Sequence, residues 1–164
     1  MVKRTRVDNA TGIRNLCDVV LHLLNTMPVN PATKFAIRCA LREAVNKSTP
    51  EYKGNNNRKN CRYVSSAALA LMNDAGADLV ADHAIPISLL QDRINKTTTR
   101  EELVALVQEY CVMALITKAE DALLRAAGLV KKMPPGCDTK DPTARYRHVG
   151  IEVIPNPGFA NCHS

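Results

Sequence analysis

The stretch Asp82-His83-Ala84-Ile85-Pro86 says most about the fold that this sequence encodes. In an extended segment neighbouring side chains point to opposite faces, so Asp82 and His83 can reach different partners from one short piece of backbone. The apolar residues Leu79 and Val80 before the pair and Ile85 after it are typical of a strand that packs on a core. Pro86 has no backbone N–H to donate, so the predicted strand ends there.

A second informative stretch, Val112-Met113-Ala114-Leu115-Ile116, is apolar and compatible with a strand, and Thr117-Lys118-Ala119-Glu120-Asp121 follows it directly. Thr117 and Glu120 have the spacing of a capping box, in which each side chain binds the backbone N–H of the other residue. Gly128 stands where a helix of this phase would end. The pattern therefore predicts a strand that runs directly into a helix.

Residues 82–86 resemble the first motif of the HNH, or His-Me finger, nucleases, and residues 112–121 resemble the strand-to-helix junction of their ββα-metal fold. The resemblance implies a metal-dependent endonuclease in which Asp82 and Asp121 bind Mg²⁺ or another divalent cation such as Mn²⁺. Asp121 occupies the position of the family's last metal ligand. His83 would be the general base that takes a proton from the attacking water.

The sequence departs from the family pattern in two places. The asparagine that steadies the catalytic imidazole has no counterpart, because Tyr110-Cys111 stand where it is expected and Asn95 is a poor substitute. An insertion from Ile87 to Tyr110 also replaces the shorter loop of the minimal module, so the resemblance covers only residues 79–90 and 111–133. A second interpretation therefore stays open, namely a catalytically inactive, nuclease-derived protein that binds nucleic acid or another partner.

Simpler structural roles also account for some of these residues. The capping box explains Glu120 without any chemistry. Asp121 suits the first turn of any helix, where the helix dipole favours negative charge. A third interpretation is a helical interaction protein in which the Asp-His strand is incidental. The absence of a strand pair joining residues 80–86 with residues 112–117 would favour that interpretation.

Composition indicates a basic protein of one domain. The chain has 164 residues and a net charge of +6, which favours a polyanionic partner through counterion release. Aromatic residues make up 4% of the chain and tryptophan is absent, so base stacking of the kind used by single-strand binders has little to work with. We expect a nucleic acid partner, with duplex DNA favoured over RNA.

Arginines supply the candidate phosphate contacts, since a guanidinium matches phosphate oxygens in both geometry and charge. Near the C-terminus, Asp141 is expected to cap a short helix that places Arg145, and either Arg147 or His148, on an exposed side. The candidate nucleic-acid-binding residues are Arg62, Arg145 and Arg147. An equally acceptable alternative is a solvated terminal helix held down by its apolar residues.

The cysteines and the N-terminus bear on location. Of the six cysteines, Cys17, Cys39 and Cys111 have apolar neighbours and are expected to be buried, and no Cys-x-x-Cys pair indicates a structural zinc site. The basic N-terminal residues lack the apolar stretch of an export signal, and no window is long and apolar enough for a membrane span. We therefore expect a cytoplasmic protein without a membrane partner.

The rest of the chain predicts a mostly helical scaffold. Helices are expected over residues 12–26, 31–46, 65–74, 87–95 and 100–110, with an exposed polar loop over 47–60. The fold class is thus α+β, predominantly helical, with a small two-stranded ββα-metal-like element. We expect one helical domain over residues 1–154 containing an HNH-like element at about 79–130, and a flexible tail over 155–164.

Overall fold

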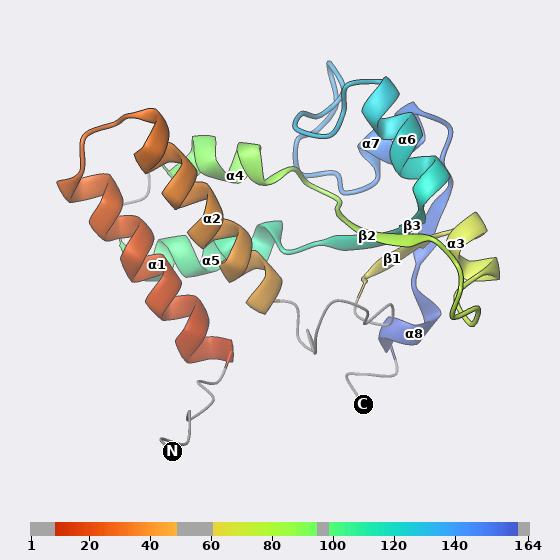
Figure 1. Ribbon diagram of the computed structural model, residues 1–164, viewed down its shortest axis with the longest axis horizontal. Helices are drawn as coiled ribbons and strands as arrows, with labels where there is room; N and C mark the ends of the chain where they lie inside the picture. The colour runs from red at the N-terminus through yellow and green to blue at the C-terminus, as the bar shows by residue number, and fades with distance from the viewer. Residues whose placement is uncertain (1–8, 49–60, 95–98, 161–164) are drawn as a thin grey trace.

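A computed structural model of the chain describes residues 9–48, 61–94 and 99–160. Four helices pack together on one side, and a small sheet with shorter helices lies on the other (Figure 1). The helices are α1 (Asn9–Thr26), α2 (Pro31–Ser48), α3 (Ser66–Ala70), α4 (Ile87–Ile94), α5 (Arg100–Tyr110), α6 (Lys118–Ala126), α7 (Ala144–His148) and α8 (Pro157–Ala160). The strands are β1 (Tyr63–Ser65), β2 (Leu79–His83), β3 (Met113–Thr117) and β4 (Val153–Pro155). The predominantly helical α+β class is as predicted.

Helices α1, α2, α4 and α5 form a bundle around one apolar core. Their buried residues recur at helical spacing, as Ile13, Cys17 and Val20 do on α1. The predicted capping box of α5 is present, because Thr99 and Glu102 each accept a hydrogen bond from the other's backbone N–H. The insertion over residues 87–110 therefore completes the bundle core.

The sheet has the strand order β2-β3-β1-β4. Strands β2 and β3 are antiparallel, β1 runs parallel to β3, and β4 runs antiparallel to β1. The central strand β3 is covered on both faces, with Ala114 and Ile116 in one apolar cluster and Leu115 in another. Burial on both faces explains why β3 is a continuous apolar run and not an alternating one.

The sheet is larger than the sequence predicted, with four strands in place of two. The two additional strands, β1 and β4, have three residues each, which is too short for a periodic pattern. Helix α3 begins at its predicted N-cap, Ser65, but ends at Ala70 and not at Asp74. The Asp74 carboxylate instead accepts from the Gly76 N–H at 2.8 Å in a turn.

Residues 155–160 do not form the predicted tail. Pro155 pairs with Tyr63 in the sheet, and α8 follows. Asn156 is 3% exposed, and its side-chain amide donates to the carbonyl of Cys61 at 2.8 Å. The predicted tail thus includes a buried anchor of the sheet edge, and the remainder of that prediction, residues 161–164, lies outside the described residues.

The cysteines within the described residues are free thiols. Cys17 is buried as predicted, whereas Cys39 is exposed and that prediction is wrong. Burial raises the pKa of Cys17 to about 11 and that of Cys61 to about 12, so both remain protonated and unreactive. Across residues 9–48, 61–94 and 99–160, no helix is long and apolar enough to span a membrane.

Candidate functional site

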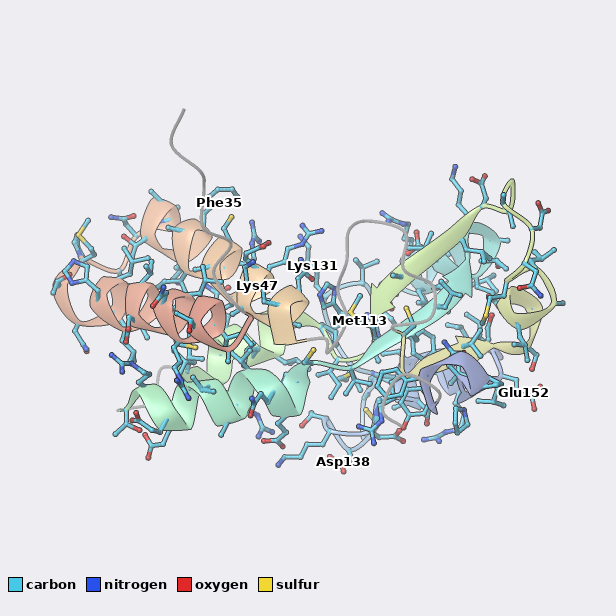
Figure 2. All side chains as sticks on the ribbon, turned by 90° about the horizontal axis from the view of Figure 1, so that it is seen from below. Phe35, Lys47, Met113, Lys131, Asp138 and Glu152 are labelled. Carbon is cyan, nitrogen blue, oxygen red and sulfur yellow. The ribbon has the colours of Figure 1, made fainter. Side chains whose placement is uncertain are left out.

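The site is built on β2, β3 and α6. The predicted strand pair is present, with Asp82 opposite Ala114 and His83 opposite Met113. Met113 lies where the helical bundle meets the sheet (Figure 2). Strand β3 then enters α6 without a loop, because Thr117 and Glu120 form the predicted capping box. The register places Leu79, at the start of β2, opposite Thr117, from which α6 begins, and Asp121 lies in the first turn of that helix.

Asp82 is held by two side chains of α7. Its Oδ2 accepts from the guanidinium of Arg145 and from the hydroxyl of Tyr146, the latter at 2.7 Å. Arg145 is 1% exposed, and its Nη1 donates to the carbonyl of Leu129 at 2.8 Å. Burial and the nearby carboxylate raise the pKa of Tyr146, so its hydroxyl keeps the proton that it donates. The carboxylate of Asp82 therefore balances a buried guanidinium.

Opposing influences act on the pKa of Asp82. Burial raises it, Arg145 and Tyr146 oppose that effect, and the negative charge of Asp121 raises it further. The negative charge of Asp121 thus acts on Asp82 across the space between α6 and β2.

Asp121 has a partner of its own. Its Oδ2 accepts from Nε of Arg125, one turn later on α6, at 2.7 Å. The Asp121 side chain is 15% exposed and that of Arg125 is 65% exposed, so the pair lies at the protein surface. The hydrogen bonds that the described residues make to Asp82 and Asp121 all end on Oδ2. Within the part of the chain that the structure describes, neither Oδ1 atom accepts a hydrogen bond.

A hard divalent cation fits this donor set in its chemistry. Mg²⁺ is usually held by one or two carboxylates, with water and substrate phosphate oxygens completing the coordination. Asp82 and Asp121 supply two carboxylates, each with an oxygen that no other described residue binds. Among the described residues, no group of three or more His, Cys, Asp or Glu side chains gathers in a form that would hold an ion. The protein ligands would therefore be these two.

His83 projects from the face of β2 opposite to Asp82, as the alternation of a strand requires. Its Nε2 is buried and has no hydrogen-bond partner within the described part of the chain. Burial, together with the positive charges of Arg42 and Arg145, lowers the pKa of His83 to about 4. The imidazole is neutral at pH 7, which is the form that accepts a proton.

The arginines proposed as phosphate contacts are not gathered at this site. The prediction that Arg145 lies on an exposed side is wrong, since Asp82 holds it inside the protein. Arg147 is exposed but pairs with Asp141 at 2.8 Å. Asp141 does not cap α7 and instead accepts from the N–H of Thr143 at 2.8 Å. Arg62 is exposed next to β1, two strands away from β2.

A link between β1 and α6 was not predicted. Oε2 of Glu120 accepts from Oγ of Ser65 at 2.6 Å, and from the backbone N–H and the hydroxyl of Thr117 at 2.8 and 3.0 Å. Ser65 is fully buried and also caps α3 through the N–H of Ala68 at 3.0 Å. The cap assigned to Glu120 is confirmed, and the same carboxylate ties the helix of the site to the sheet.

The order strand, antiparallel strand, helix and the proximity of two carboxylates are the features of this site that carry functional information. Comparison of the chain with models of protein families, with curated proteins and with solved structures finds no match.

Proposed function

We propose that this chain is a metal-dependent endonuclease that hydrolyses phosphodiester bonds, with DNA as its substrate. One observation carries the proposal: the antiparallel pair β2–β3 continues directly into α6, and Asp121 on α6 lies within electrostatic reach of Asp82 on β2. His83 follows Asp82 on the same strand. The order of these elements supports the proposal, which takes its chemistry from the resemblance to the ββα-metal nucleases.

The chemistry would be divided among three side chains. Asp82 and Asp121 would hold the divalent cation, and the bound ion would stabilise negative charge on the phosphate and the leaving oxygen. His83, in its neutral form, would accept the proton of the attacking water. Because Nε2 is buried in the free protein, proton transfer at that atom requires the chain around His83 to open when substrate binds.

A specific observation favours a second candidate, a nucleic-acid-binding protein without catalysis. Arg145 and Tyr146 already satisfy one oxygen of Asp82, and burial keeps Nε2 of His83 from water. If these contacts persist with substrate bound, the ββα element is a scaffold and not a catalyst. Nucleic acid would then bind through the basic surface of the protein.

Nicking of supercoiled plasmid DNA separates the two candidates. The wild-type protein is incubated with Mg²⁺, with Mn²⁺ or with EDTA, beside His83→Ala and the control His22→Ala, which alters an exposed histidine on α1. An endonuclease nicks only with metal, and His83→Ala loses on the order of a hundredfold in rate, the usual contribution of a general base. Equal nicking by wild type and His83→Ala would contradict the endonuclease proposal. DNA binding without nicking supports the second candidate.

A further inference from the structure

Within the described residues some surface cations have an acidic partner, and the three on one face of α2 are among those that do not. The paired cations within the described residues include Lys47, Arg100, Lys118, Arg125, Lys140 and Arg147. Lys34, Arg38 and Arg42 are exposed and make no ion pair with any residue in 9–48, 61–94 or 99–160. They stand four residues apart, so they lie along one face of α2 with about 6 Å of helix rise between successive charges.

This stripe leads to the candidate site. The side-chain amide of Gln91 on α4 donates to the carbonyl of Lys34 at 3.0 Å, at the N-terminal end of α2. At the other end of the stripe, Arg42 is close enough to His83 for its charge to act on the imidazole. The segment that leads from β2 into α4 therefore lies beside α2, and Figure 1 shows α4 next to the N-terminal part of α2.

Two further unpaired lysines lie beside the same segment. Lys131 and Lys132, in the loop after α6, are exposed and form no ion pair among the described residues. Ser88 donates through its hydroxyl to the carbonyl of Lys131, which fixes this loop to the start of α4 between His83 and Gln91. The loop thus widens the basic surface next to the stripe.

We propose that Lys34, Arg38 and Arg42, together with Lys131 and Lys132, bind the phosphate backbone of duplex DNA beside His83. This inference rests on the proposed function for the identity of the ligand and names the surface that would hold it. Cations without ion-pair partners can bind phosphate without first breaking an ion pair, and arginine presents a fork that matches phosphate oxygens. Regularly spaced charges on a straight helix suit a regularly spaced polyanion.

The test compares two triple variants with the same change in net charge. Lys34→Gln/Arg38→Gln/Arg42→Gln removes the stripe, and the control Arg100→Gln/Lys118→Gln/Lys140→Gln removes three paired surface cations. Binding of a short fluorescent DNA duplex is measured by anisotropy at several salt concentrations in EDTA, so that no cleavage occurs. The stripe variant should bind on the order of tenfold more weakly, and its log–log salt slope should fall by about 0.9 for each lost phosphate contact.

The control variant should change affinity less than about threefold, because its charges interact with DNA only at long range. The assignment is wrong if both triple variants lose the same DNA affinity, or if the stripe variant binds DNA as the wild type does. It is also wrong if the protein prefers polyglutamate to DNA and this preference depends on the stripe. Because binding is measured without metal, failure here is separate from failure of the endonuclease. A protein that binds through the stripe and never nicks plasmid contradicts only the catalytic proposal. If the wild-type protein nicks plasmid and the stripe variant binds DNA with unchanged affinity, only this assignment is contradicted.

Discussion

Arg145, buried to 1% exposure, binds Oδ2 of Asp82, so a carboxylate that the sequence assigns to a metal ion is bound by a cation of the protein itself. The two residues stand 63 positions apart in the chain. A guanidinium inside a protein stays charged, and leaving it without a counterion is costly. Asp82 therefore stabilises the fold in addition to any role at the site.

This double role predicts that Asp82→Asn destabilises the protein by about 3 kcal/mol, because the buried Arg145 loses its counterion. The free energy of unfolding is measured by urea titration of wild type, Asp82→Asn, Arg145→Met and the double variant. The double variant should be more stable than the sum of the two single effects predicts, since it buries no unpaired charge. Additive losses would mean that the two residues stabilise the fold independently.

The neighbouring serines Ser65 and Ser66 offer a matched comparison of two hydrogen bonds to glutamate. Ser65→Ala should cost about 2 kcal/mol, because it leaves the buried Glu120 contact unmade and removes the cap of α3. Ser66→Ala removes an exposed bond to Glu152 of 2.8 Å and should cost less than about 0.5 kcal/mol. Thermal and urea unfolding of both variants give the comparison. Similar losses of stability in the two variants would mean that the Ser65–Glu120 hydrogen bond does not stabilise the packing of α6 on β1.

Local signals made much of this fold predictable from sequence. The caps at Thr99 and Thr117 each depend on a residue three positions away, so both α5 and α6 begin where predicted. Strands β1 and β4 depend on partners far along the chain, as Val64 does on Leu115 and Ile154, and three residues carry no periodic signal.

The candidate site was predictable only in part, for the same reason. The proximity of Asp82 and Asp121 follows from a strand pair and a capping box, and both patterns are visible in sequence. The position of Arg145 was not visible, because a helix of five residues containing two arginines and a histidine has the composition of a solvated surface. One signal was available: a carboxylate on a partly buried strand needs a cation or a hydrogen-bond donor nearby.

His83 predicts a specific loss of stability in acid. Its pKa is about 4 in the folded protein against an ordinary value of 6.5, so folding favours the neutral ring. The group contributes its full stability above pH 6.5, and this is lost progressively as the pH falls from 6.5 to 4, by on the order of 3 kcal/mol in total. In His83→Gln the melting temperature should depend less on pH between 6.5 and 4. An unchanged acid dependence in the variant would assign the loss to other groups.

The two carboxylates predict a cation site that can be measured without any nuclease assay. Asp121→Asn should weaken binding of Mn²⁺, followed by the electron paramagnetic resonance signal of the free ion, because it removes one of two carboxylate ligands. The free energy of unfolding should change by less than about 1 kcal/mol, because the Arg125 side chain in the lost ion pair is largely exposed. Asp92→Asn, an exposed carboxylate on α4, is the matched control. If both variants bind Mn²⁺ as the wild type does, Asp121 is only a helix-terminal charge, and the ion has no site between β2 and α6.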